Sequence, residues 1–182
     1  KLNANPDYEN KSSYSFTVTA TDAAGTSAAT TVTFSITNVD DIAPTITSGT
    51  TGPPLEENSG AGQTVYTITA TDNIAVSGYA IVGTDAALLT LYQSEGTPVN
   101  GFIALNANPD YEDKHDYSFT VTATDAAGNT SAATTVTFFI TNVDDIAPTI
   151  TSGATGNNLE ENIGAGQTVY TITADANDGG TN

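Results

Sequence analysis

The residues best suited to chemistry in this sequence are carboxylates that stand in small groups. The chain has 21 Asp and Glu against three Lys and Arg, one His and no Cys in 182 residues. The clearest groups are Asp7 with Glu9, Asp110 with Glu112, and Asp144 with Asp145. Carboxylates held close together repel one another, and a hard cation with about six to eight oxygen ligands relieves that repulsion. The recurring acids therefore indicate calcium binding, although a single Asp in a loop more often only keeps that loop solvated.

The charge balance excludes several classes of function. A formal net charge of −18 at pH 7 argues against nucleic acid and against an anionic membrane surface, because both need basic partners. The lack of Cys excludes a disulfide scaffold, a zinc-thiolate site and a cysteine nucleophile. No apolar run reaches the length of a transmembrane helix, so we expect no membrane insertion in this segment.

The chain contains an internal repeat. A segment that begins at Leu2 returns from Leu105, and a second matching segment begins at Thr37 and again at Thr141. The later copy gains one residue, Asn129, between these two segments. A period of about 104 residues suits one β-sandwich domain per repeat and is longer than the period of solenoid repeats.

The repeat sets the expected domain organisation. With Pro44 and Pro148 as junctions, residues 1–43 are the C-terminal part of one repeat, 44–147 a complete repeat, and 148–182 the N-terminal part of the next. A partial sandwich exposes its core face and unpaired strand edges, so it should not be stable alone. We therefore expect the chain to be a section of a longer protein, or its partial repeats to be completed by neighbouring chains.

The local pattern is that of β-strands throughout. Six segments are predicted as strands, the first three from a regular alternation of apolar residues with Thr and Ser. These segments are 14–20, 32–36, 66–70, 79–82, 88–92 and 102–105. Hairpin turns are expected at Ala23–Gly25 and at Asn100–Gly101. No segment has sustained helical periodicity, and about seven strands per repeat predict an all-β, antiparallel Greek-key sandwich.

The acids gather where the predicted strands end. If the strands run alternately up and down the sandwich, three acidic groups fall at one end of the complete repeat and two single acids at the other. The three groups are Glu56 with Glu57, Asp110 with Glu112, and Asp144 with Asp145. The acids at the other end are Asp72 and Asp125. Each junction would therefore receive carboxylates from two successive domains.

Catalysis is not expected from these residues. The single histidine, His115, has Ser12 at the matching place in the other copy. With one His and no Cys, neither a Ser-His-Asp triad nor a zinc-histidine site recurs with the repeat. Paired carboxylates cleave glycosides in some enzymes, but here they recur in each repeat, which a single active site would not require.

Four short motifs occur twice each in the chain. They are Glu57-Asn58 with Glu161-Asn162, Asp7 to Glu9 with Asp110 to Glu112, Ala20 to Asp22 with Ala123 to Asp125, and Asn38 to Pro44 with Asn142 to Pro148. They match the Glu-Asn, Asp-Arg-Glu, Ala-x-Asp and Asp-x-Asn-Asp-Asn-x-Pro motifs of cadherin repeats. The chain resembles cadherin repeats, in the bacterial cadherin-like form of very large surface adhesins, over essentially its whole length.

The resemblance implies a calcium cluster at each of the two junctions. The first would comprise Asp7, Glu9, Asn38, Asp40 through its carbonyl, Asp41, Asp72 and Asp125. The second would comprise Glu57, Asp110, Glu112, Asn142, Asp144, Asp145 and either Asp175 or Asp178. Asp22 would serve a junction upstream. Ile42 and the stretch from Asp72 to Ile74 each lack a side-chain ligand of the family, so one or two ions per junction is an alternative to the family's three.

By resemblance, the expected function is that of a calcium-rigidified extracellular spacer or stalk in a large surface adhesin or filament. Its partners would be neighbouring repeats of the same chain or identical chains in a filament, and elsewhere in the full protein a glycan or cell-surface ligand. Two alternatives remain. The sandwich could be an accessory module that binds glycans on exposed aromatic residues, such as Phe139, which stands where the other copy has Ser35. The repeats could also assemble laterally into a fibre or sheath.

Overall fold

The computed structural model describes residues 1–96 and 99–175, which form two compact units. The first unit runs over Lys1–Ile42, and the second begins at Ala43. Apart from a short 3-10 turn at Ala86–Leu88, all regular structure in the described residues is β-strand. None of these residues belongs to a helix that could span a membrane.

The first unit is built from two antiparallel strand pairs. Its strands are β1 (Ser13–Val18), β2 (Thr21–Asp22), β3 (Gly25–Thr26) and β4 (Thr30–Ser35). β1 pairs with β4, so that Tyr14 lies opposite Phe34 and their rings stack at 5.3 Å between centroids. β2 and β3 form the hairpin expected at Ala23–Gly25.

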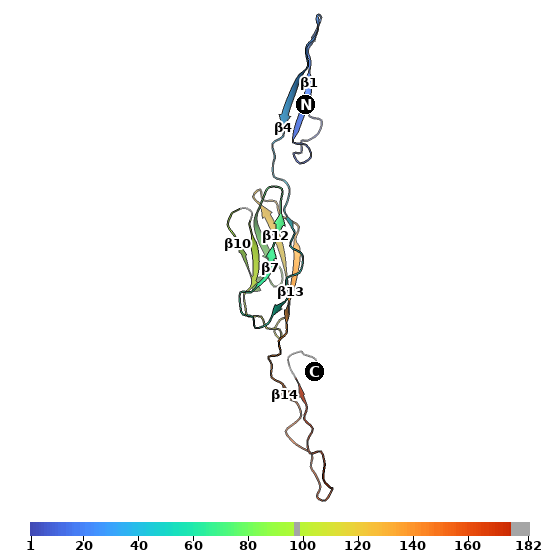
Figure 1. The fold of residues 1–182 in the computed structure, drawn as a ribbon, viewed down its shortest axis with the longest axis vertical. Coiled ribbons are helices and arrows are strands. Elements are labelled where there is room, and N and C mark those ends of the chain that lie inside the picture. Colours follow the sequence, from blue (N-terminus) through green and yellow to red (C-terminus); the bar gives the residue numbers. More distant parts are fainter. Residues whose placement is uncertain (97–98, 176–182) are drawn as a thin grey trace. The chain divides into compact units, whose positions relative to one another are not determined.

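The second unit contains two larger sheets (Figure 1). One has the order β6 (Leu55–Glu56), β13 (Thr134–Thr141), β12 (Asp116–Asp125) and β9 (Val76–Val82). The other has the order β10 (Leu89–Gln93), β11 (Gly101–Leu105) and β7 (Thr64–Ile68). β6 runs parallel to β13, and the other strand pairs in these two sheets are antiparallel. Two short pairs join β5 (Thr45–Ile46) to β8 (Ala70–Thr71) and β14 (Thr149–Ile150) to β15 (Ala174–Asp175).

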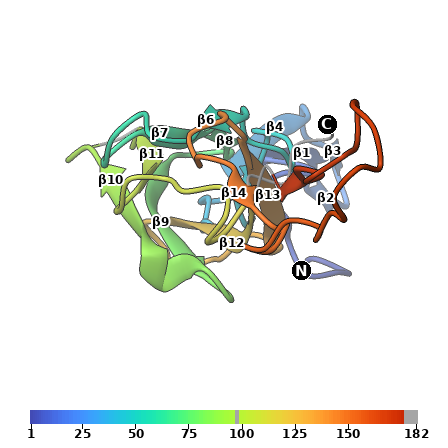
Figure 2. The ribbon, with the colours of Figure 1, turned by 90° about the horizontal axis from the view of Figure 1, so that it is seen from below.

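The two sheets pack against each other (Figure 2), and buried side chains of both form one hydrophobic core. Along β12 and β13, every second residue points inward, because successive side chains of a strand point to opposite faces. Phe119 and Phe138 come from one sheet and meet Val65 and Ile103 from the other. The prediction of an all-β sandwich is therefore confirmed.

Equivalent residues of the two repeat copies differ in burial. Phe119 and Phe138 are 1% and 2% exposed in the second unit. Their counterparts Phe16 and Phe34 in the first unit are 52% and 38% exposed. The sequence pattern of these strands is the same, so the difference comes from the opposing sheet, which covers β12 and β13 in the second unit.

One predicted turn was wrong. The pair Asn100–Gly101 does not form a two-residue hairpin turn, because Gly101 belongs to β11 and pairs with Gln93 of β10. Ser94 and Asn100 stand at the two ends of the connection. The backbone amide of Ser94 donates to the Asn100 carbonyl at 2.9 Å, and the backbone amide of Asn100 donates to Ser94 Oγ at 3.0 Å. Gly101 is buried, and a Cβ placed there would lie 2.8 Å from the Tyr79 ring. Glycine is needed here for close packing and not for a turn.

Candidate metal centre

Glu57 is the buried centre of the acidic group in the second unit. It follows β6, and its amide donates to the carbonyl of Thr141 at 3.1 Å, which extends the parallel pairing with β13. Its side chain is buried, with 2% of the residue exposed. Oε2 accepts a hydrogen bond from the amide of Tyr111 at 2.8 Å, and Oε1 accepts one from the amide of Val143 at 2.5 Å. One carboxylate therefore connects three segments of the chain.

Three carboxylates converge at this place. Glu57, Glu112 and Asp145 each offer one oxygen, and these oxygens all lie within 4.8 Å of one another. They come from the end of β6, the loop before β12 and the segment after β13. Because each residue belongs to a different part of the chain, the cluster forms only when the sandwich is folded.

Two asparagines hold the carboxylates in place. Asn58 Nδ2 donates to Asp145 Oδ2 at 2.6 Å, and Asn142 Nδ2 donates to Glu112 Oε1 at 3.3 Å. Asn58 has a φ of 58°, in the left-handed region that asparagine tolerates better than most residues. Asn162, its counterpart in the next repeat, has a φ of 63°. Asn58 was not among the predicted site residues, although the recurring Glu-Asn motif contains it.

The cluster concentrates negative charge. Partial desolvation raises the pKa of Glu112, and the neighbouring carboxylates of Glu57, Asp145 and Asp110 add to the rise. The ion pair between Lys114 and Asp85 and the contact between His115 Nε2 and Asp116 Oδ2 both lie outside this cluster. Hydrogen-bond donors surround these carboxylates, but neither of those two contacts brings a basic side chain to them.

The donor set fits a calcium ion. Calcium–oxygen distances of about 2.3–2.6 Å mean that two oxygens on one ion lie at most about 5 Å apart. The separation of at most 4.8 Å between the three oxygens meets that condition. The ligands are oxygens only, as hard cations prefer, and there is neither Cys nor His among them.

The other predicted residues of this junction are placed less closely. Asp110 interacts electrostatically with Glu112, and its Oδ1 accepts a hydrogen bond from the amide of Asp113 at 3.0 Å. Asp144 follows β13 next to Asp145 but is not in the group of three. Asp175 lies in β15 and is also outside that group, and Asp178 lies outside the described residues.

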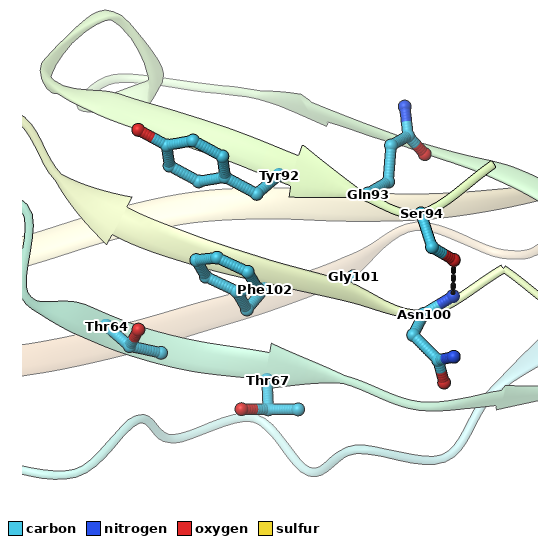
Figure 3. Close-up of a pocket in the computed structure, with 8 residues that line it drawn as sticks. All are labelled: Thr64, Thr67, Tyr92, Gln93, Ser94, Asn100, Gly101 and Phe102. Atoms are coloured by element: carbon cyan, nitrogen blue, oxygen red, sulfur yellow. Dashed lines mark hydrogen bonds between the residues drawn. The ribbon is translucent and has the colours of Figure 1, made fainter.

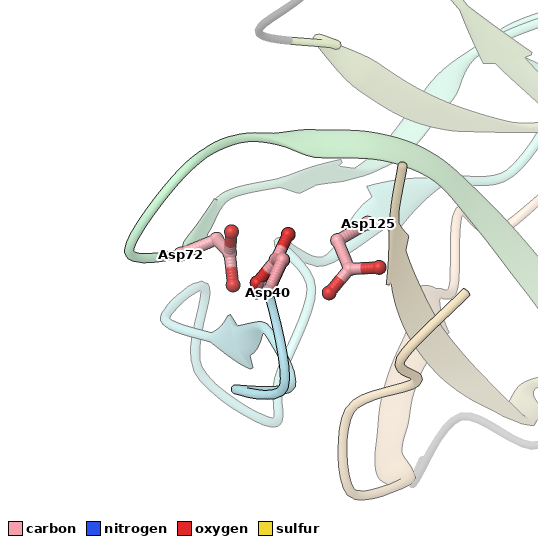
Figure 4. A group of neighbouring side chains, drawn as sticks. All are labelled: Asp40, Asp72 and Asp125. Carbon is pink, nitrogen blue, oxygen red and sulfur yellow. The ribbon is translucent and has the colours of Figure 1, made fainter. Parts of the chain in front are cut away.

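Besides the cluster of three, this unit contains a pair of neighbouring carboxylates, Asp72 and Asp125 (Figure 4). Asp72 follows β8 and Asp125 ends β12, and an oxygen of each lies within 4.8 Å of the other. Asp72 Oδ2 accepts a hydrogen bond from the amide of Ile74 at 2.9 Å. Its Oδ1 is buried without a hydrogen-bond partner in the described part of the chain. An orphaned buried carboxylate oxygen is a free position for a cation.

Asp125 is held ionised by local donors. Desolvation is the largest influence and pushes its pKa up, but hydrogen bonds from the Asn129 side chain and from nearby backbone amides together lower the pKa below its ordinary value. Asn129 Nδ2 donates to Oδ2 at 2.7 Å, and the amides of Gly128 and Asn129 donate to Oδ1 at 2.7 and 2.8 Å. Asn129 was not predicted as a member of the site.

The remaining predicted residues lie in the first unit. Asp7 Oδ1 accepts a hydrogen bond from the amide of Asn10 at 2.9 Å, and Glu9 is in the same turn. Asp22 Oδ1 accepts from the amides of Ala24 and Gly25 in the β2–β3 hairpin. Three predicted site residues lie after β4: Asn38, Asp40 and Asp41. Figure 4 also draws Asp40. That Asp72 and Asp125 share a cation with Asp7, Glu9, Asn38, Asp40 and Asp41 stays a prediction, as does a role of Asp22 at an upstream junction.

Comparison with known proteins finds cadherins. No family model matches the chain. It is 29% identical over 189 residues to "Protocadherin-like wing polarity protein stan" of Drosophila melanogaster, and 27% identical over 168 residues to "Protocadherin gamma-A10" of Pan troglodytes. These matches cover 97% and 82% of the chain. They span only 5% and 18% of the two relatives.

The fold is that of cadherin extracellular domains. Domains 3–6 of protocadherin gamma B2 match with a TM-score of 0.75 at 22% identity over 97% of the chain and 42% of that structure. A cis-dimer structure of protocadherin gammaB7 matches with a TM-score of 0.66 at 22% identity over 92% of the chain and 41% of that structure. Together with the sequence relatives, these structures support the predicted cadherin-like repeats. The description of one matched structure as extracellular cadherin domains agrees with the prediction of an extracellular chain.

Proposed function

We propose that the chain is a section of an extracellular array of cadherin-like repeats, which calcium stiffens at each junction and which acts as a spacer or stalk in cell adhesion. The observation that carries this proposal is the convergence of Glu57, Glu112 and Asp145. Asp145 lies in the segment that leads from the complete repeat to the next one, whereas the other two belong to the sandwich. The near-identical repeat copies within one chain favour a long array, as in bacterial giant surface adhesins.

The residues proposed to hold calcium fall into two sets. Around the second junction they are Glu57, Asp110, Glu112, Asn142, Asp144 and Asp145, with Asp175 or Asp178 from the next repeat. Around the first they are Asp7, Glu9, Asn38, Asp40, Asp41, Asp72 and Asp125. A calcium ion would neutralise these carboxylates and connect the linker to the sandwich.

The chain's own residues explain why such a junction would respond to calcium. Without a cation, Glu57, Glu112 and Asp145 repel one another, and the linker that carries Asp145 is pushed away from the sandwich. With a cation, the same three groups attract a shared centre, which restrains the linker. Extracellular modules bind calcium with dissociation constants of about 10⁻⁴–10⁻³ M, a range in which millimolar calcium saturates or nearly saturates the site.

Calcium titration of the chain by isothermal calorimetry tests this proposal. We expect saturable binding in the sub-millimolar to millimolar range, and a loss of affinity of about tenfold or more for one class of site in Glu57→Gln. Glu56→Gln is the matched control, because Glu56 is the neighbouring acid but lies outside the cluster. Absence of binding at millimolar calcium, or equal effects of the two substitutions, would contradict the proposal.

The partners that we propose are neighbouring repeats. The exposed faces of β1 and β4 have the same residue types as the buried faces of β12 and β13, so they fit the opposing sheet of a cadherin-like repeat. One matched structure is a protocadherin cis-dimer, which supports association between repeats of this kind. Whether the completing strands belong to the same chain or to a second copy is decided by the state of association of the natural protein.

A further inference from the structure

A shallow hollow of about 560 Å³ lies on the sheet formed by β7, β10 and β11 (Figure 3). Eight residues line it: Thr64, Thr67, Tyr92, Gln93, Ser94, Asn100, Gly101 and Phe102. None of them is among the carboxylates proposed to bind calcium. The hollow is therefore a separate feature of the same repeat.

Its floor is a pair of exposed aromatic rings. Tyr92 and Phe102 lie directly opposite each other on β10 and β11. Their rings stack with 4.9 Å between centroids and 12° between planes, while the residues remain 49% and 41% exposed. The next residue along β11, Ile103, is fully buried, so the pair stands on the outer face and adds nothing to the core between the sheets.

Polar groups lie beside the rings. Thr67 is the cross-strand neighbour of Phe102 on β7, and Asn100 precedes β11 at the end of the hollow. The Asn100 amide donates to Ser94 Oγ at 3.0 Å, which fixes the backbone of that end. No hydrogen bond of the Thr67 hydroxyl or of the Asn100 side-chain amide is found among the described residues. These groups can donate and accept bonds to a ligand.

The lining carries no charge. The eight residues include no Asp, Glu, Lys, Arg or His, although the chain as a whole has a net charge of −18. An anionic ligand would be repelled by the negative chain and would find no basic side chain in the lining. A cationic ligand would find no carboxylate in the lining and would bind at the acidic clusters instead. The ligand that fits is therefore uncharged, with an apolar face for the two rings and hydrogen-bonding groups for the polar side chains beside them.

We propose that this hollow binds a pyranose ring of a neutral glycan. The C–H face of the sugar would stack on the exposed side of the Tyr92–Phe102 pair, and Thr67 and Asn100 would bond its hydroxyls. A peptide that adds a strand would instead use a sheet edge, whereas the hollow lies across the face of three strands. The alternative is that the pair only stabilises the hairpin through its cross-strand contact.

Affinity electrophoresis of the whole chain in native gels tests the proposal, with hydroxyethyl cellulose, galactomannan or xyloglucan as neutral probes and alginate as the anionic comparison. We expect at least one neutral polysaccharide to retard the chain, alginate not to, and the retardation to persist in EDTA. Tyr92→Ala should weaken binding at least tenfold, whereas Tyr92→Phe should retain most of it. Persistence in EDTA separates this site from the calcium sites.

Phe139→Ala is the matched control, because Phe139 is 45% exposed but lies on β13 of the other sheet. It should leave the retardation unchanged. If Tyr92→Ala fails to fold by circular dichroism, Thr67→Val and Asn100→Ala take its place and should each weaken binding several-fold. The proposal is overturned if none of the three neutral probes retards the chain, or if Phe139→Ala lowers binding as much as Tyr92→Ala. It is also overturned if the hollow substitutions abolish a concentration-dependent self-association instead.

Discussion

Glu57 has one role in folding and one in the proposed cation site. Its two carboxylate oxygens accept hydrogen bonds from the backbone amides of Tyr111 and Val143. One of these two oxygens also belongs to the three-carboxylate cluster. The backbone of the loop and of the linker is therefore arranged around this side chain. A carboxylate oriented by such bonds loses little conformational freedom when it becomes a ligand.

Glu57→Ala is expected to destabilise the chain even in EDTA. Removal of the carboxylate leaves the amides of Tyr111 and Val143 without their acceptor, and an unsatisfied buried donor costs about 1–3 kcal/mol. Urea unfolding followed by tyrosine fluorescence measures the change in the free energy of unfolding. Glu56→Ala should change it by less than about 0.5 kcal/mol, as exposed substitutions usually do. Equal effects of the two would assign Glu57 no such structural role.

Glu112→Gln is expected to change stability in opposite directions with and without calcium. The pKa of Glu112 is raised by desolvation and by neighbouring carboxylates, so the folded state disfavours its ionised form. A raised carboxyl pKa contributes stability at low pH, and this contribution is lost as the pH rises through the folded-state pKa. In EDTA at pH 7, the substitution should therefore raise the free energy of unfolding, and this gain should vanish at acidic pH.

Calcium should reverse the effect of Glu112→Gln, because the ion uses the negative charge that the calcium-free protein tolerates poorly. Urea unfolding at pH 7 in EDTA and in millimolar calcium, repeated at acidic pH in EDTA, gives the three required values. Asp113→Asn serves as the control, since Asp113 is in the same loop but outside the cluster. A variant less stable than wild type in EDTA would refute the assignment of repulsion to this group.

The sequence allowed the carboxylates of the site to be predicted, but not the groups that orient them. Glu57, Glu112 and Asp145 stand in recurring motifs, and their position at strand ends follows from the strand pattern. Asn58 and Asn129 act through side-chain bonds to Asp145 and Asp125. Such bonds depend on local backbone conformation, including the positive φ of Asn58, and no residue spacing reveals them.

At the scale of elements, the alternation of apolar and polar residues predicted strands correctly, whereas the Asn-Gly dipeptide predicted a turn that does not form. The alternating segments 14–20 and 32–36 overlap β1 and β4 and miss their bounds by one or two residues, because a period of two is the signature of a strand but does not mark its ends. The Asn100–Gly101 pair has the composition of a tight turn. In the structure Gly101 lies within β11, where the Tyr79 ring packs so closely against it that a side chain would not fit. Close packing between sheets is a tertiary effect that a dipeptide cannot encode.

Identical substitutions in the two repeat copies should have very different effects. Phe119→Ala removes a side chain that is 1% exposed in the core and should cost about 3–5 kcal/mol. Phe16→Ala removes its counterpart, which is 52% exposed, and should cost less than about 1 kcal/mol. Urea unfolding of the two variants measures both values. A large effect of Phe16→Ala would mean that another surface covers β1 and β4 in solution.

At the scale of the whole molecule, the charge and the repeat act together. A net charge of −18 keeps the chain soluble but makes its folded parts repel one another. Because the motifs recur with each repeat, the acids of one repeat are expected beside those of the next at every junction. Under the proposed function, a bridging cation would convert this repulsion into a restraint, and repetition of one such junction would multiply its effect along the array.

The last prediction concerns the length of such an array. In a chain with two complete repeats in tandem, small-angle scattering should give a larger and better-defined maximum dimension in millimolar calcium than in EDTA. Asp145→Ala at the junction should remove most of this change, because it deletes the linker's member of the cluster, whereas Asp113→Ala should not.

Sodium chloride separates bridging from simple screening. At about 1 M salt the screening length is about 3 Å, so most of the repulsion between exposed carboxylates across the junction is screened, but no ion connects them. High salt in EDTA should therefore not extend the chain, and calcium should. If high salt reproduces the calcium effect, the junction responds to charge density alone. The acids would then act as a solubilising surface, and the stiffened spacer would have to be abandoned.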